Sequence, residues 1–155
     1  MTLRKGTRAA NPAMLEQWMD LERLAEVEVS SEDPEWPIEG ALIEGDGRGW
    51  RAAVPGAQKL RVRFDAPQSL GVIHLVFDEA DYERVQEFTL EWSPDRGRTF
   101  YSLVRQQFTF SPTGAIRETE NYAVDLKDVT DLELQIVPDV SQRPLVATLS
   151  KLRLR

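Results

Sequence analysis

Apolar and polar residues alternate along much of this chain, and this period of two limits the possible folds more than any other feature. The pattern occurs in residues 26–30, 59–64, 87–92, 131–136 and 151–155. Alternation of this kind predicts strands that place one face on a core and the other face in water. Residues 72–77 are apolar on both faces apart from His74, which predicts a central strand.

Turn-forming sequences separate the predicted strands. They include Asp33-Pro34, Gly45-Asp46-Gly47, Pro55-Gly56, Ala66-Pro67, Ser111-Pro112-Thr113-Gly114 and Arg143-Pro144. Residues 93–98 lie between two alternating segments and contain Gly97, which predicts a hairpin. Seven or more short strands with such turns predict an all-β antiparallel sandwich. The chain shows neither a repeat nor a low-complexity linker, so we expect one domain over residues 11–155.

The N-terminal part has a different pattern. Residues 1–10 are polar and basic and predict a flexible tail, and Asn11-Pro12 is a typical helix start. Apolar residues at helical spacing then predict a short amphipathic helix over residues 12–22. We expect its apolar face to pack on the same domain, with a partner or a second copy as the alternative.

The charge of the chain is concentrated in one segment. The formal net charge is −7, and residues 16–46 carry eleven acidic residues against Arg23 alone. Such a run is usually a solvated face, although it could also attract a basic partner or a cation. The acidic balance argues against nucleic-acid binding. Because there is no Cys and one His, the sequence excludes disulfides, thiolate metal sites and a cysteine nucleophile.

Targeting signals are not visible in the sequence. No apolar segment follows the basic N-terminus as an export signal requires, and no stretch approaches the ~20 apolar residues of a membrane span. We therefore expect a soluble protein that is cytoplasmic by default. A processed exported protein is the alternative.

Several short motifs follow one another in an order that resembles a known family. They lie at residues 25–32, 41–50, 58–66, 70–75, 87–95, 97–100 and 147–154. This order is similar to the discoidin, or coagulation factor 5/8 type C, family of the galactose-binding-like superfamily. The resemblance covers residues 24–155. It implies an eight-stranded jelly-roll sandwich whose loops at one end bind sugars, lipid head groups or proteins.

The resemblance also implies a candidate calcium site. In the family, a turn before a Trp commonly holds a structural calcium ion, and Asp46 before Trp50 matches that turn best. The family often completes the site with a Glu on the last strand, where this chain has Lys151. An ammonium group cannot bind calcium, and an ion pair with Asp46 could replace the metal. The resemblance implies that Trp50 itself is a core residue.

Candidate ligand-binding residues come from the loops. Trp36, in a loop with two prolines, could stack on a sugar or anchor a protein interface, or fold back onto the end of the sandwich. Tyr82 lies between Asp81 and Glu83 in a polar loop, and carboxylates beside an aromatic ring suit sugar hydroxyls. Arg117, in a long connection after residue 105, is a further candidate.

Nothing in the sequence favours catalysis. His74 shares a strand face with Val72 and Val76, which favours a satisfied sheet residue over a catalytic base. No nucleophile, phosphate-loop or metalloprotease motif is present. The sequence therefore favours a non-catalytic carbohydrate-binding module without a cofactor. The alternative is an intracellular protein-interaction scaffold or homo-oligomeric adaptor that uses the acidic segment and the N-terminal helix.

Overall fold

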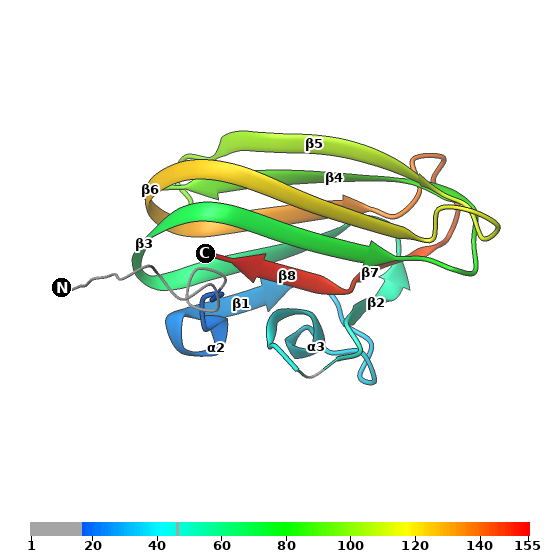
Figure 1. Ribbon diagram of the computed structural model, residues 1–155, viewed down its shortest axis with the longest axis horizontal. Helices are drawn as coiled ribbons and strands as arrows, with labels where there is room; N and C mark the ends of the chain where they lie inside the picture. The colour runs from blue at the N-terminus through cyan, green and yellow to red at the C-terminus, as the bar shows by residue number, and fades with distance from the viewer. Residues whose placement is uncertain (1–16, 46) are drawn as a thin grey trace, which may run out of the picture.

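The computed structural model describes residues 17–45 and 47–155, and strands dominate it (Figure 1). In chain order the elements are α2 (Leu21–Leu24), β1 (Ala25–Val29), α3 (Glu39–Leu42), β2 (Trp50–Pro55), β3 (Gln58–Asp78), β4 (Arg84–Ser93), β5 (Tyr101–Phe110), β6 (Arg117–Val137), β7 (Val146–Leu149) and β8 (Lys151–Leu154). The paired strands are all antiparallel, and the predicted eight-stranded sandwich is confirmed.

Two long strands, β3 and β6, connect the layers of the sandwich. The first half of β3 lies between β1 and the second half of β6, and that half of β6 also pairs with β4, which carries β5 at the edge. The second half of β3 lies between the first half of β6 and β8. The register between β3 and β6 shifts near Pro67, whose missing N–H group interrupts a ladder. Both strands bend at the same end of the molecule (Figure 1).

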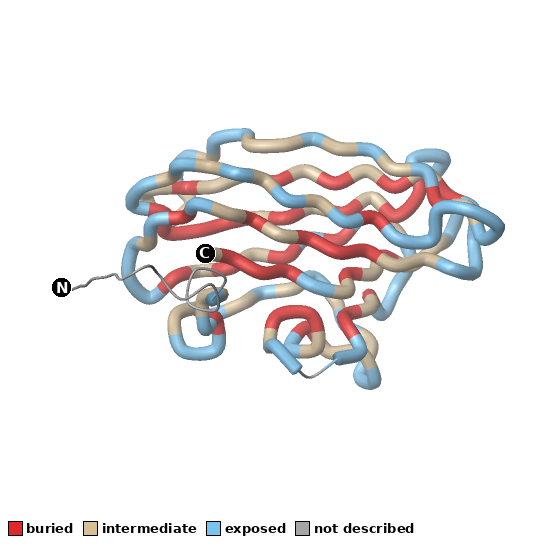
Figure 2. Tube along the Cα trace, in the orientation of Figure 1, coloured by how far each residue is buried: buried red, intermediate tan, exposed pale blue. Residues whose placement is uncertain are grey.

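The core lies between these layers and follows the alternation of the sequence (Figure 2). Phe64, Phe77, Phe88 and Phe110 are fully buried, and the rings of Phe77 and Phe88 stack with centroids 5.2 Å apart. Burying each such ring contributes about 1.5–3 kcal/mol. Trp50 is a core residue, as the resemblance implied, and its Nε1 donates to the carbonyl oxygen of Ser31 at 3.0 Å.

The predicted strands are confirmed, including the central position of residues 72–77, which have a neighbouring strand on each side. The 93–98 hairpin joins β4 and β5 as predicted. The predicted break at Ala66-Pro67 does not end a strand, because β3 continues through it with a shifted register. The short helix α3 has no counterpart among the elements predicted from the sequence.

The structure has a short helix near the N-terminal end of the domain, but of the described part of the predicted range 12–22 only Leu21 and Glu22 are helical. Residues 17–20 are not helical, and a four-residue helix, α2, begins only at Leu21. The reason is tertiary, because the backbone N–H of Met19 donates to Leu154 O on β8 at 2.7 Å instead of joining a helix. The rest of that prediction and the predicted tail over residues 1–10 lie outside the described residues.

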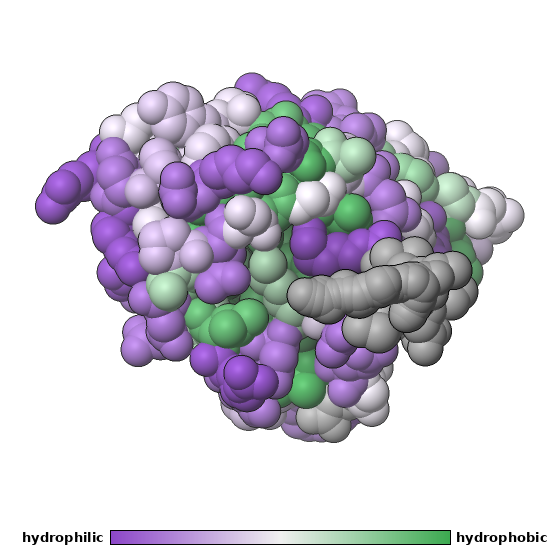
Figure 3. All heavy atoms as spheres, turned by 60° about the vertical axis from the view of Figure 1, so that its left-hand side comes forward, coloured by the Kyte–Doolittle hydropathy of each residue, from purple (hydrophilic) through white to green (hydrophobic). Residues whose placement is uncertain are grey.

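The surface is mainly polar. The face in Figure 3 is largely hydrophilic with smaller apolar patches between the polar groups. Within residues 17–45 and 47–155, none of the helices has the length and apolarity needed to cross a membrane. The acidic part of the chain runs through α2, β1 and α3, along one side of the molecule in Figure 1, and β1 is an edge strand of its sheet.

Candidate functional site

The loop between β3 and β4 carries three of the predicted ligand-binding residues. Tyr82 is 56% exposed, and Asp81 and Glu83 beside it are also exposed. The N–H groups of Asp81 and Tyr82 donate to Glu79 Oε2 at 2.9 and 3.2 Å. Glu79 is in turn paired with the buried guanidinium group of Arg84, at 3.2 Å. The loop therefore presents Tyr82 from a backbone that is held in place.

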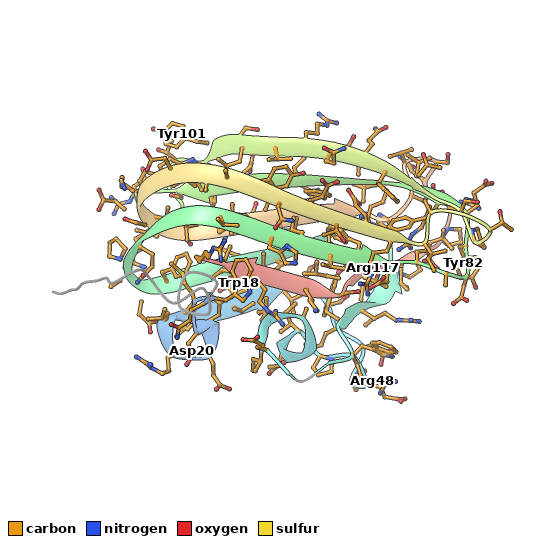
Figure 4. The ribbon with its side chains drawn as sticks, viewed as in Figure 1. Trp18, Asp20, Arg48, Tyr82, Tyr101 and Arg117 are labelled. Carbon is orange, nitrogen blue, oxygen red and sulfur yellow. The ribbon has the colours of Figure 1, made fainter. Side chains whose placement is uncertain are left out.

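Arg117, the fourth candidate, lies at the start of β6 near the same end of the sandwich as Tyr82 (Figure 4). Its guanidinium group makes two hydrogen bonds to the carboxylate of Asp78, at 2.7 and 3.2 Å, and Ser150 Oγ donates to Asp78 at 2.7 Å. Burial opposes ionisation of Asp78, but the hydrogen bonds from Arg117 and Ser150 hold its pKa below the ordinary value. The guanidinium group of Arg117 is thus already paired with Asp78, and a ligand would have to share that guanidinium group with the carboxylate.

Trp36 belongs to a different group of residues. Its ring is half-buried, with the guanidinium carbon of Arg48 4.3 Å and that of Arg51 4.8 Å from the ring centroid. The loop is tied to β2, because Arg51 N donates to Trp36 O at 3.2 Å. These contacts resemble the folded-back arrangement more than a free stacking platform. The ligand-binding role of Trp36 stays a prediction.

Asp46, the residue that the candidate calcium site requires, lies outside the described residues. Lys151, which argues against calcium, is exposed at the start of β8. In the part of the chain that the structure describes, no three acidic or histidine side chains gather as a metal site would require. The calcium site and the alternative ion pair with Asp46 both stay predictions.

A row of polar residues lies on the outer face of β8, β3 and β6. His74 is the register partner of Arg153 on one side and of Asn121 on the other. His74 Nδ1 lies 2.7 Å from Asn121 Oδ1, so Nδ1 carries the hydrogen because an amide oxygen only accepts. The indole ring of Trp18 stacks on the His74 ring, with centroids 5.6 Å apart. His74 is therefore a satisfied sheet residue, as predicted, and also part of a surface cluster.

This row lines a pocket of about 370 Å³, which we call the β8 pocket. Its lining residues are Trp18, Gly40, Glu44, Gly45, Gly47, His74, Ser150, Lys151 and Arg153. Arg153 is largely buried under α3 and donates to Ala41 O at 2.7 Å. Burial lowers the pKa of Arg153 from its ordinary value, while nearby Glu44 opposes that change. Among the described residues, the pocket thus combines an aromatic ring with cationic donors and the exposed carboxylate of Glu44.

A second pocket, of about 520 Å³, lies between the β2–β3 turn and the β6–β7 loop. Three of its lining residues are prolines, and its charged groups, Asp139 and Arg143, form an ion pair at 2.8 Å. Because these charges already neutralise each other, this pocket offers fewer free polar groups than the β8 pocket.

The β8 pocket is not predictable from the sequence alone. Helical spacing assigns Trp18 to a helix, and the strand registers that align His74, Asn121 and Arg153 cannot be read from alternation alone. The available signal is the alternating basic side chains of residues 151–155, which place three cations on one face of one strand.

The fold of this chain is similar to that of several solved structures. No protein-family model matches the chain, and neither does any curated protein. Among solved structures, the third family 32 carbohydrate-binding module of a family 31 glycoside hydrolase from Clostridium perfringens is similar, with a TM-score of 0.67 and 16% identity over 94% of this chain and 98% of that one. A pectin-binding carbohydrate-binding module gives a TM-score of 0.60 at 17% identity, covering 86% and 91% of the two chains.

A third similar structure is the family 32 module of NanJ from C. perfringens, in complex with galactose. Its TM-score is 0.59 and its identity 12%, over 84% of this chain and 92% of that one. At such low identities the likeness defines the fold and not the ligand. Together with the strand order and the register described above, it shows that this chain shares the antiparallel β-sandwich fold of these three structures.

Proposed function

We propose that this protein is a non-catalytic carbohydrate-binding module that binds a saccharide in the β8 pocket. The observation that carries the proposal is the composition of that pocket, in a fold that known carbohydrate-binding modules share. Trp18, His74, Lys151 and Arg153 line this pocket, which has a volume of about 370 Å³. Binding sites typically combine an aromatic surface with a few converging polar groups.

The chemistry of the pocket suits a polyhydroxylated ligand. Lys151 and Arg153 supply charged donors, and Glu44 supplies a charged acceptor, so sugar hydroxyls can be bound from both directions. Trp18 supplies an apolar edge near these groups, held by its stacking on His74. An acidic sugar would gain an additional contact with the cations of β8.

The similar proteins support this ligand class without identifying the sugar. Their descriptions name pectin, galactose, chitosan and an unsaturated mannuronic acid. Glycoside hydrolysis usually requires two carboxylic groups on either side of the bond that is cleaved. Among the described residues that line the β8 pocket, Glu44 is the carboxylate. We therefore propose binding without hydrolysis.

The loop that carries Asp81, Tyr82 and Glu83 is the competing location for a sugar. It fits the expectation that loops at one end of the sandwich hold the ligand. Tyr82 lines neither of the two pockets described above, however, and Arg117 is already paired with Asp78. For these reasons we favour the β8 pocket over the loop.

A glycan array followed by calorimetry tests the proposal. The array contains galactosides, pectin and alginate oligosaccharides and chito-oligosaccharides, and its best ligand is titrated into variants of the chain. We expect Lys151→Ala to weaken binding by about 10-fold or more, because a hydrogen bond to a charged group contributes about 1.5–3 kcal/mol. We expect His74→Ala to weaken binding as well, because it removes the ring on which Trp18 stacks. Lys127→Ala, which removes a similarly exposed lysine, is the matched control.

Two outcomes would count against this assignment. If Tyr82→Ala abolishes binding while His74→Ala and Lys151→Ala do not change it, the ligand lies at the loop. If no glycan binds and the mass of the protein rises with concentration in ultracentrifugation, the protein-interaction alternative replaces the carbohydrate-binding one.

A further inference from the structure

The edge strand β1 directs part of its backbone away from the sheet. Among the described strands, β1 pairs with β3 alone. The N–H group of Ser30, directly after β1, donates to Lys59 O at 3.0 Å, and the register of the two strands places these residues opposite each other. In an antiparallel pair, such hydrogen-bonded positions alternate with positions whose backbone groups point the other way. The N–H and C=O groups of Val27 and Val29 therefore point away from β3.

This outer side of β1, which we call the free edge, is not covered by the described part of the chain. Within residues 17–45 and 47–155, no group forms a hydrogen bond with the outward backbone groups of Val27 and Val29. The side chain of Val27 is half-buried, whereas Val62 opposite it is only 1% exposed. A row of unpaired backbone groups at a sheet edge is a template for a further strand.

An apolar groove of about 240 Å³, which we call the β1 groove, lies beside the free edge. It is formed by α2, β1, α3 and the residues next to α3, and α2 and α3 lie next to each other beside β1 in Figure 1. Its lining residues are Leu21, Glu22, Ala25, Val27, Ile38, Glu39, Leu42 and Ile43. Most of them are apolar, and the two carboxylates are exposed. The groove therefore suits an apolar side chain with basic groups beside it.

The strand that already pairs with β1 shows which sequence complements it. Residues 59–64 of β3 alternate basic and apolar side chains, and the basic ones lie opposite Ser30, Glu28 and Glu26. Glu28 Oε2 lies 3.3 Å from Arg63 Nη1. In the described part of the chain, Glu22, Glu26 and Glu39 form no ion pair. β1 thus retains carboxylates that a second basic strand could pair with.

We propose that the free edge of β1 binds an extended segment of another protein in which apolar and basic residues alternate. The segment adds to the sheet as a strand, with its backbone paired to Val27 and Val29. One of its apolar side chains enters the β1 groove, and its basic side chains lie beside Glu26. A second copy of β1 fits this edge less well, because two such strands would bring acidic side chains close to one another, and like charges on paired strands are destabilising.

The proposed interaction is separate from carbohydrate binding. Among the described residues, none lines both the β1 groove and the β8 pocket. Loss of saccharide binding and loss of peptide binding are therefore measured on different residues, and failure of one proposal leaves the other unaffected.

Fluorescence anisotropy with two labelled synthetic peptides tests the proposal on the full chain. One peptide copies residues 59–64, Lys-Leu-Arg-Val-Arg-Phe. The other has the order Leu-Val-Phe-Lys-Arg-Arg, which keeps the composition and charge but removes the alternation. We expect the alternating peptide to bind at least about 10-fold more tightly, and its affinity to fall with added salt. Equal binding of the two peptides, or no binding of either at about 1 mM protein, would overturn the proposal.

Amide hydrogen exchange followed by NMR shows whether the free edge is used. We expect the N–H groups of Val27 and Val29 to exchange quickly in the protein alone and slowly with the alternating peptide. The N–H group of Glu28 faces β3 and should be protected in both states. Protection of Val27 without peptide would overturn the proposal. If that protection rises with protein concentration, a second copy occupies the edge, and if it does not, the chain covers the edge itself.

Variants of β1 and its surroundings locate the peptide. Val27→Pro removes an outward N–H group, which an edge strand tolerates, and should weaken binding about 2- to 10-fold, as expected for one hydrogen bond. Glu26→Gln and Glu39→Gln should each weaken it about 2- to 5-fold, as expected for an exposed ion pair. Asp125→Asn, which changes an exposed carboxylate on β6, is the matched control and should bind like the unmodified chain.

Melting transitions of these variants show that they still fold, and the two glutamine variants test the site even if the proline variant does not. Unchanged peptide affinity in Glu26→Gln and Glu39→Gln would overturn the proposal. An equal loss of affinity in Asp125→Asn would also overturn it, because the peptide would then respond to the net charge of the protein and not to the edge of β1.

Discussion

The indole ring of Trp18 lies on the imidazole ring of His74, with the ring planes 20° from parallel and the centroids 5.6 Å apart. The guanidinium carbon of Arg155 lies 4.7 Å from the centroid of the same indole ring. Trp18 thus joins the segment before α2 to one layer of the sandwich, in addition to the backbone hydrogen bond of Met19 to β8 (Figure 4). The same side chain forms one wall of the β8 pocket.

Replacing this ring should affect both stability and ligand binding. We expect Trp18→Ala to lower the free energy of unfolding, with about 0.5–1.5 kcal/mol from the lost stacking alone. It should also weaken binding of the saccharide found on the array. Tyr101→Ala is the matched control, since Tyr101 contacts Trp92 at 5.4 Å and does not line the pocket. Urea denaturation and calorimetry measure the two effects, and equal loss of sugar affinity in both variants would contradict the assignment of Trp18.

The ion pair of Asp139 and Arg143 should make stability depend on pH. The hydrogen bond from Arg143 holds the pKa of Asp139 below its ordinary value, and the backbone N–H of Val85 adds to this effect. The carboxylate therefore stabilises the folded chain at pH values above its unfolded pKa of about 4, and this contribution is lost as the pH falls through the folded pKa.

Asp139→Asn should accordingly destabilise the protein at neutral pH and make little difference at low pH. The measurement is the urea midpoint of both proteins between about pH 7 and pH 3. Asp125→Asn is the control, because the Asp125 side chain is 88% exposed and should change stability little at any pH. A constant difference between Asp139→Asn and the unmodified chain across the range would show that the ion pair is not its source.

The turn before β2 depends on a glycine for two separate reasons. Gly49 has φ +83°, and a Cβ atom there would lie 2.9 Å from the carbonyl oxygen of Leu149 on β7. Gly49→Ala should therefore destabilise the chain by more than the ~1 kcal/mol expected from the positive φ alone.

Gly56→Ala separates these two effects. Gly56 has φ +97°, but no atom lies within 4 Å of the position that a Cβ atom would take there. We expect this variant to show the backbone cost without the clash, so thermal denaturation should give a clearly lower melting temperature for Gly49→Ala. Equal melting temperatures would mean that β7 moves away at no cost.

Removing the aromatic ring of the β3–β4 loop distinguishes the two sugar locations without disturbing the core. Tyr82 is exposed, and the loop is held by the backbone contacts to Glu79 rather than by its ring. We expect Tyr82→Ala to change the free energy of unfolding by less than about 0.5 kcal/mol and to leave saccharide affinity unchanged. Calorimetry with the array ligand measures the affinity, and a large loss would move the site to the loop.

The strands and their inward faces could be predicted from the chain because alternation is a local property. Leu60, Val62 and Phe64 needed only their neighbours to be assigned to a buried face, and the structure buries all three. The inward orientation of Glu118 was not predictable in the same way. Alternation assigns polar residues to water, and only the tertiary structure shows that this carboxyl group is buried against Gln86 of β4.

The sequence by itself determined the fold class, the strand positions and the core, since hydrophobic periodicity and turn chemistry act over a few residues. The tertiary structure alone decided which side chains meet. Residues 17–20 leave the predicted helix because Met19 finds a backbone acceptor on β8, far along the chain. His74, Asn121 and Arg153 align because the registers of two strand pairs coincide, and a register is fixed by pairing between distant segments.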